Sequence, residues 1–228
     1  MELIIIIVAS MATIIVNLIM KMNVKELEKI ALDEELNEIT KKYPKNTEIC
    51  KYILKKLENK TTQIEENIDS QAILYIAIQD KISIGNTHDS FTRIQTMAHE
   101  CLHSVQDKKM LIFNFVFSNI YIIYFFIICL LVVIKKLPNK MLFSNILLIF
   151  SFIYYVIRIF LENDAMIKAE YLAKEYIENQ KISTKEEIEK ITQGLKKIND
   201  GCIKGTNCNL FVKIMIKVVI FNILALIF

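Results

Sequence analysis

The sequence has no tryptophan and few residues that favour turns. Its 228 residues include only four glycines and two prolines. Sandwiches and barrels of short antiparallel strands need frequent turn residues, so this scarcity excludes an all-β fold and favours long helices. The five cysteines are odd in number, with Cys129 in an apolar run and Cys101 inside a histidine motif. They therefore do not form the disulfide framework of a small secreted domain.

A strong charge bias is also missing. The 28 basic and 25 acidic residues are interspersed along the chain and give a formal net charge of +3. No basic face of the kind that binds nucleic acid is expected, so nucleic acid is not an expected partner. In contrast, 54% of the residues are hydrophobic and the mean hydropathy is +0.37, which favours membrane spans.

Four apolar runs have about the length that a helix needs to cross a bilayer. They cover residues 3–20, 110–134, 141–161 and 210–228. The first begins without positive charge and no cleavage site follows it, so we expect an anchor and not a secretory signal. The last contains Lys213 and Lys217, whose long side chains can reach the headgroups, and we expect it to span. The six residues from Lys135 to Lys140 leave room only for the turn of a transmembrane hairpin.

We therefore expect a mainly α membrane protein with about four transmembrane helices and a zincin-like soluble domain, made of an active-site helix and a short β-hairpin. A transmembrane hairpin returns the chain to its starting side, so the two soluble segments must face one compartment. The expected divisions are a transmembrane anchor at 1–21, a soluble segment with the histidine motif at 22–109, the transmembrane hairpin at 110–161, a soluble helical segment at 162–209 and a C-terminal transmembrane segment at 210–228.

Local patterns predict the elements of the soluble segments. Apolar residues recur at helical spacing between Val24 and Leu36 and again between Ile49 and Leu57. Residues 72–78 and 81–85 predict a β-hairpin that turns near Asp80. Ser90 is expected to cap a helix that runs to Gln106.

The second soluble segment is predicted to be helical over 165–177. Residues 183–187, Ser-Thr-Lys-Glu-Glu, are typical of a capping box and predict a further helix start. Cys202 and Cys208 are expected in a glycine-containing loop, as two reduced cysteines, although a disulfide or a role in metal binding stays open.

The motif His99-Glu100-Cys101-Leu102-His103 is the main chemical feature of the sequence. Histidines at positions i and i+4 project from adjacent turns of one helix face, so both imidazoles can reach one metal ion. Glu100 lies beside that face and can accept a proton without being a ligand. With three histidines in the chain, roughly 0.002 such matches are expected by chance, so accident is a poor explanation.

A catalytic zinc site of this kind takes a third protein ligand and leaves one position for water. The remaining histidine, His88, precedes the motif in a predicted loop, and we interpret it as solvated. A carboxylate must then supply the ligand, and the acidic residues just past the third apolar run are the best source. Glu162, Asp164 and Glu170 are the candidates. We favour Glu162, because Ala165 and Ala169 would let its helix pack closely against the histidine helix.

The motif Ala98-His99-Glu100-Cys101-Leu102-His103-Ser104-Val105-Gln106, followed after a transmembrane hairpin by Glu162-Asn163-Asp164-Ala165, resembles the YugP-type neutral zinc metallopeptidases. The similarity covers about residues 72–228 and reaches loosely to HtpX-like membrane proteases. It implies a zinc ion held by His99, His103 and Glu162. Asp164 is expected to support a ligand histidine through a ring N–H.

The expected reaction is metal-assisted peptide hydrolysis with Glu100 as the catalytic general base. Arg93 and Tyr171 are candidates for oxyanion stabilisation, and the hairpin strands are candidates to pair with an extended substrate. The expected substrates are membrane proteins or their juxtamembrane segments, because the motif and Glu162 both lie close in sequence to apolar runs.

Two alternatives remain. A non-catalytic metal-binding scaffold or regulatory protein would need the ligands but not Glu100. An intramembrane protease would place the motif in an apolar span, which the charges of Arg93, Asp107 and Lys108 disfavour. We expect a multi-pass integral membrane protein, in the plasma membrane of a prokaryote. Ten lysines flank the spans on the soluble side and three on the other, which predicts a cytoplasmic metal domain.

Overall fold

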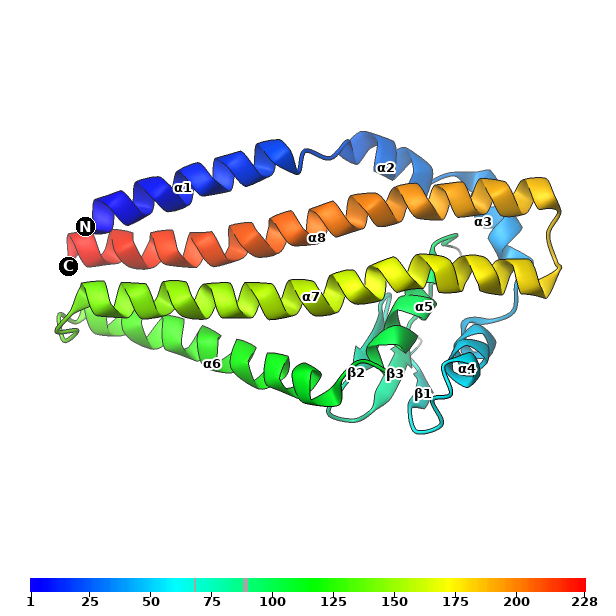
Figure 1. The fold of residues 1–228 in the computed structure, drawn as a ribbon, viewed down its shortest axis with the longest axis horizontal. Helices are drawn as coiled ribbons and strands as arrows, with labels where there is room; N and C mark the ends of the chain where they lie inside the picture. Colours follow the sequence, from blue (N-terminus) through cyan, green and yellow to red (C-terminus); the bar gives the residue numbers. More distant parts are fainter. Residues whose placement is uncertain (68, 88–89) are drawn as a thin grey trace. The chain divides into compact units, whose positions relative to one another are not determined.

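The computed structural model describes residues 1–67, 69–87 and 90–228 (Figure 1). These residues form two compact units. The first, here the apolar unit, contains residues 1–22, 113–160 and 204–228. The second, here the mixed unit, contains residues 23–112 and 161–203. Helices α6 (Lys108–Val133), α7 (Lys140–Gln180) and α8 (Lys185–Ile227) each contribute residues to both units.

Four helices in the described residues are long and apolar enough to cross a membrane: α1 (Glu2–Ile19), α6, α7 and α8. Only 6% to 33% of their most apolar windows is buried within the protein, so large apolar side chains remain on the outside. Such a surface is consistent with a membrane protein. The prediction of a mainly helical chain with four membrane-length apolar helices is confirmed.

Polar contacts join helices inside the apolar unit. Ser144 on α7 and Asn222 on α8 are both buried and hydrogen-bond to each other, with Asn222 Nδ2 2.9 Å from Ser144 Oγ. Tyr121 Oη and Ser151 Oγ lie 2.9 Å apart between α6 and α7. The Lys217 ammonium lies 5.1 Å from the centre of the Tyr121 ring, a cation–π distance. The Lys217 side chain is thus oriented by its contact with Tyr121 in the apolar unit.

The mixed unit contains a small sheet. Strands β1 (Gln63–Glu66), β2 (Ile73–Ile76) and β3 (Lys81–Ile84) pair in the order β1-β3-β2. The predicted antiparallel hairpin is confirmed as β2 and β3, and Asp80 at its turn has a positive φ of 48°. Strand β1 was not predicted, because its sequence Gln-Ile-Glu-Glu has one apolar residue. It pairs in parallel with β3.

Four shorter helices complete this unit: α2 (Val24–Ala31), α3 (Glu34–Lys41), α4 (Asn46–Lys56) and α5 (Arg93–His103). The predicted helix from Ser90 to Gln106 is shorter at both ends. Thr92 takes the N-cap position without a side-chain cap, and the Ser90 hydroxyl is hydrogen-bonded to that of Thr92. The expected Ser90 cap is therefore wrong.

One core unites the sheet with α4, α5, α7 and α8. Ala165, Ala169 and Ala173 recur every fourth residue of α7 and are fully buried, in the same core as Ala98 and Cys101 of α5. Alanines at this spacing form a smooth strip that lets another element approach closely. This strip lets the part of α7 that follows Glu162 pack closely against α5, the helix that carries both histidines.

The structure confirms one feature of α8 and corrects another. Thr184 Oγ1 accepts from the Glu187 N–H, and a Glu187 carboxylate oxygen accepts from the Thr184 N–H, which is the predicted capping box. Cys202 and Cys208 lie within α8 and not in a loop, and both are free thiols. The nearby glycines misled the prediction, because tertiary packing outweighs their weak helix propensity.

Candidate metal centre

The two histidines of the motif converge because α5 is a regular helix through both. Their Nε2 atoms lie 3.0 Å apart, and their ring centres 4.5 Å apart with nearly perpendicular planes. Apolar residues Ile94, Met97, Ala98 and Cys101 cover the opposite side of α5 and are fully buried. This burial fixes the rotation of the helix, so His99 and His103 point away from the core.

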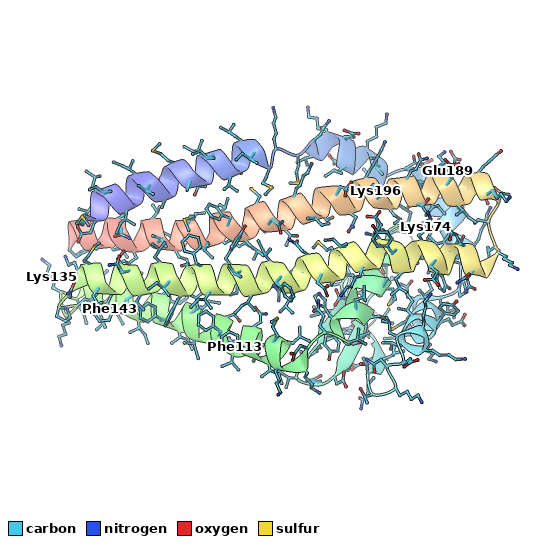
Figure 2. All side chains as sticks on the ribbon, viewed as in Figure 1. Phe113, Lys135, Phe143, Lys174, Glu189 and Lys196 are labelled. Carbon is cyan, nitrogen blue, oxygen red and sulfur yellow. The ribbon has the colours of Figure 1, made fainter. Side chains whose placement is uncertain are left out.

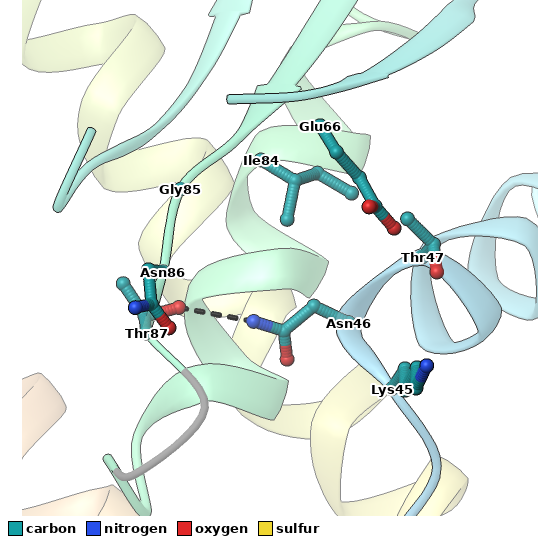
Figure 3. A pocket seen from close by; sticks show the side chains of 8 residues that line it. All are labelled: Lys45, Asn46, Thr47, Glu66, Ile84, Gly85, Asn86 and Thr87. Carbon is teal, nitrogen blue, oxygen red and sulfur yellow. Dashed lines mark hydrogen bonds between the residues drawn. The ribbon is translucent and has the colours of Figure 1, made fainter. Parts of the chain in front are cut away.

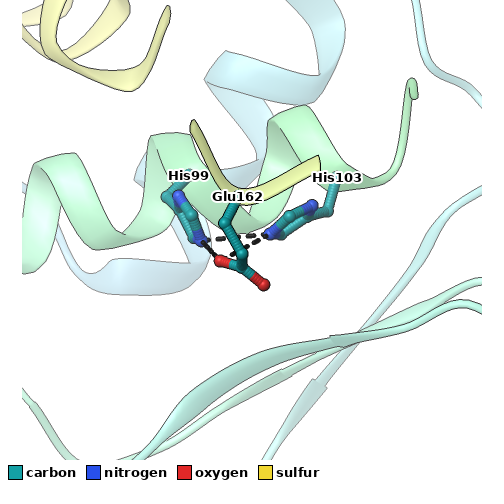
Figure 4. A group of neighbouring side chains, drawn as sticks. All are labelled: His99, His103 and Glu162. Carbon is teal, nitrogen blue, oxygen red and sulfur yellow. Dashed lines mark hydrogen bonds and ion pairs between the residues drawn. The ribbon is translucent and has the colours of Figure 1, made fainter. Parts of the chain in front are cut away.

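Glu162 completes the group from α7 (Figure 4). Its Oε2 lies 3.5 Å from His99 Nε2 and 3.8 Å from His103 Nε2. The side chains of His99, His103 and Glu162 are 17%, 11% and 11% exposed, so little water reaches them. The structure therefore brings together the three residues predicted as ligands, in a group that could hold a metal ion.

The spacing of the three ligand atoms fits a tetrahedral ion. Bonds of about 2.0–2.1 Å to nitrogen and oxygen place two ligand atoms of a tetrahedron about 3.3 Å apart. The distances of 3.0, 3.5 and 3.8 Å lie on either side of that value. Two imidazoles and a carboxylate suit several divalent ions, so geometry does not identify the metal.

Glu100 lies beside this group. Its Oε2 accepts the backbone N–H of Tyr75 at 2.6 Å, and its Oε1 lies 3.9 Å from His99 Nε2. Burial raises the pKa of Glu100 above its usual value, although the neighbouring histidines oppose the rise. One carboxylate oxygen is thus anchored to β2, while the other is directed towards His99.

Gln106 was not predicted as a site residue. Its side-chain amide contacts His103 at one end and Leu161 and Asp164 at the other. Asp164 therefore reaches the site through Gln106, and the expected direct bond from Asp164 to a histidine ring N–H is wrong. The second Asp164 oxygen pairs with Lys168 at 2.6 Å.

Other candidates from the sequence lie elsewhere. Glu170 accepts from Asn199 and pairs with Lys196, so it is not one of the three converging residues. Arg93 is 1% exposed and donates to carbonyl groups around the end of α3, while Tyr171 is 69% exposed. Neither is placed to stabilise an oxyanion at the site. His88 lies outside the described residues.

A cavity of about 210 Å³ adjoins the site, because His99 forms part of its wall. Apolar and small polar side chains of three helices line the rest: Thr92, Gln95, Thr96, Met166, Ala169, Ile198, Asn199 and Cys202.

Two further cavities involve neither histidine. One of about 250 Å³ lies at the start of α4, where Asn46 donates to Thr87 (Figure 3). The other, of about 290 Å³, includes Lys174 of α7 and Glu189 and Lys196 of α8 (Figure 2).

Comparisons with known proteins found no matching family model, no matching curated protein and no matching solved structure. The resemblance to YugP-type peptidases therefore stays a prediction from the motif residues.

Proposed function

We propose that this chain is a membrane-bound zinc metallopeptidase that hydrolyses peptide bonds of membrane or juxtamembrane proteins. The single observation that carries the proposal is the convergence of His99, His103 and Glu162 with Glu100 beside them. Zinc is the ion that most often occupies two histidines and a glutamate with one position left open. A membrane setting is supported by the four apolar helices.

The residues of the site have distinct roles in this proposal. His99, His103 and Glu162 hold the ion, which when bound lowers the pKa of a water molecule and polarises the scissile carbonyl. Glu100 takes the proton of the attacking water on Oε1 and delivers it to the leaving amine. The Tyr75 N–H holds Oε2 and so keeps the carboxylate in one orientation.

Strand β2 is the proposed platform for the substrate. Among the described residues it forms one edge of the sheet, and the Tyr75 N–H points away from β3 towards Glu100. An extended peptide that pairs with the outward groups of this edge other than the Tyr75 N–H, which Glu100 holds, would lie along the site. One of its side chains would then enter the cavity beside His99.

The proposal is tested by comparing zinc content and proteolysis in purified Glu100→Gln and wild-type protein, with unfolded casein as substrate. We expect both proteins to bind one zinc ion and only the wild type to cleave, because the amide cannot accept the proton. Glu178→Gln is the matched control, since Glu178 is an exposed carboxylate that pairs with Lys174.

Undiminished cleavage by Glu100→Gln would refute the assignment of the base. Stoichiometric zinc without cleavage in either protein, over a panel of membrane-protein substrates, would favour the metal-binding scaffold instead. In that case Glu100 would not act as a general base.

A further inference from the structure

Gln106 lies three residues past His103, just beyond the end of α5, and its amide bridges two elements. Its Oε1 is 2.8 Å from His103 Nδ1. Its Nε2 is 2.8 Å from the Leu161 carbonyl oxygen and 3.1 Å from Asp164 Oδ2. Leu161 directly precedes Glu162. The Gln106 amide therefore connects the candidate ligand His103 to the residue before the candidate ligand Glu162.

The hydrogen-bond chemistry determines which way the amide points. A backbone carbonyl only accepts, so the NH₂ group must face Leu161. Asp164 supports this orientation, because a carboxylate that is ionised beside the Lys168 ammonium can also only accept. The amide oxygen is then left for His103. This assignment follows from the partners and does not depend on telling oxygen from nitrogen.

The orientation of the amide determines the tautomer of His103. Because Gln106 Oε1 can only accept, His103 Nδ1 must carry the proton. His103 Nε2 is then the nitrogen with a free lone pair, and it is the atom that faces His99 and Glu162. A metal ligand needs its lone pair on that side.

We propose that Gln106 is the positioning residue of the metal centre, which sets the His103 tautomer and also couples His103 to the Glu162 segment. The inference rests on the proposed metal site and adds to it a residue that never touches the ion. Removing a group of this kind typically costs about 10- to 100-fold in metal affinity.

Two substitutions separate the bond to His103 from the bonds to the Glu162 segment. Gln106→Leu removes both, and we expect zinc affinity to fall about 10- to 100-fold. Gln106→Glu keeps an acceptor for His103 but places a carboxylate against Asp164 and the Leu161 carbonyl, so affinity should also fall. Adding Asp164→Asn to Gln106→Glu puts a donor opposite the new acceptor, and we expect partial recovery relative to Gln106→Glu alone.

The readouts are zinc affinity, by competition with a chromophoric chelator, and the absorption spectrum of the cobalt-loaded protein. The spectrum reports ligand geometry, so a merely structural role would leave it unchanged while lowering the unfolding temperature. Ser104→Ala is the matched control. Ser104 also follows α5, but it bonds to Asn59 and the Cys101 carbonyl. Its removal should leave zinc affinity and the spectrum unchanged.

The outcomes separate this inference from the proposed function. A wild-type protein that binds no zinc would overturn both. Tight zinc binding by the wild type, with the same affinity and cobalt spectrum in Gln106→Leu, would overturn the role of Gln106 alone. Lower affinity in both Gln106 variants, with recovery in the double variant, is the expected result.

Discussion

Glu162 and Asp164 lie two residues apart on α7 and have different surroundings. Glu162 faces both histidines, whereas Asp164 meets Gln106 and Lys168. We expect Glu162→Ala to lose zinc almost completely, because two histidines alone hold the ion weakly. Asp164→Asn should weaken binding about 10- to 100-fold, because the amide has one acceptor oxygen and can no longer accept from both Gln106 and Lys168. If metal analysis finds full zinc occupancy in Glu162→Ala and no zinc in Asp164→Ala, then Asp164 is the ligand and Glu162 is the supporting residue.

Two kinds of signal predicted the site: short spacing for the histidine motif, and for Glu162 its place just past the third apolar run together with the family resemblance. His99, Glu100 and His103 lie within one turn and a half of helix, so their common face follows from helix geometry. Gln106 could not be assigned its role from spacing, because it couples His103 to two partners that lie 55 and 58 residues further along the chain. Arg93 was misassigned for the same reason, since its acceptors lie about 50 residues earlier.

At the scale of elements, Arg93 links the start of α5 to the end of α3. Its guanidinium donates to the carbonyl oxygens of Thr40, Tyr43 and Pro44 and to Asn46 Oδ1, with each distance 2.8 or 2.9 Å. The Thr40 carbonyl lies in the last turn of α3, where a cation is favoured by the helix dipole. Burial lowers the pKa of Arg93, but arginine remains charged in proteins.

Arg93→Lys should therefore destabilise the protein although it keeps the charge. An ammonium has three donors and cannot reach four acceptors arranged around a planar fork. We expect a loss of about 2 kcal/mol or more in the free energy of unfolding, measured by denaturation in detergent. An unchanged free energy for Arg93→Lys would contradict this role.

Asp80 organises the hairpin that carries Tyr75. It accepts from the hydroxyls of Thr61, Thr62 and Tyr75. Burial acts to raise the pKa of Asp80, but these hydrogen bonds outweigh it and the pKa lies below its usual value. A carboxyl with a lowered pKa stabilises the fold above its unfolded-state pKa of about 3.9, and the contribution is lost as pH falls through the lower folded-state pKa.

We therefore expect Asp80→Asn to lower the free energy of unfolding by about 1 kcal/mol at pH 7. The difference from the wild type should shrink as the pH falls below about 4. Thermal unfolding across this pH range measures it. Asp200→Asn is the control, because the Asp200 side chain is exposed and pairs with Lys196 on the surface of α8. A difference that stays constant down to pH 2 would exclude the charge as its cause.

The elements predicted from the sequence are those with a local signal. Alternation and a turn predicted β2 and β3, and the Thr184 to Glu187 pattern predicted the start of α8. Strand β1 has no such pattern, because its place depends on pairing with β3 and on the ion pair between Glu65 and Lys81. The uninterrupted α8 through Cys202 and Cys208 likewise depends on packing.

At the scale of the whole molecule, orientation in the membrane is open to a direct test. The lysine distribution favours a cytoplasmic mixed unit. Cys50 and Cys101 are fully buried, whereas Cys202 in the mixed unit is exposed. In a background with Cys129→Ser and Cys208→Ser, we expect an impermeant maleimide to label Cys202 only after permeabilisation of the cells.

The exposed turn residue Asn139 provides a control for the side of the membrane opposite to Cys202. With Asn139→Cys, the new thiol in the turn between α6 and α7 should be labelled in intact cells, because α6 and α7 are each long and apolar enough to cross the membrane and the predicted orientation puts their turn outside. Labelling of Cys202 in intact cells would place the metal centre outside and reverse the predicted orientation.

The most direct test of the metal centre is X-ray absorption at the zinc edge of the purified, zinc-loaded protein. Two imidazoles and a carboxylate predict only nitrogen and oxygen neighbours at about 2.0–2.1 Å, with the outer-shell scattering of histidine rings. Two thiols, Cys50 on α4 and Cys101 on the motif helix α5, lie 3.6 Å apart, and they are the competing ligands. A sulfur shell at about 2.3 Å, or the absence of imidazole scattering, would contradict a centre built from His99, His103 and Glu162.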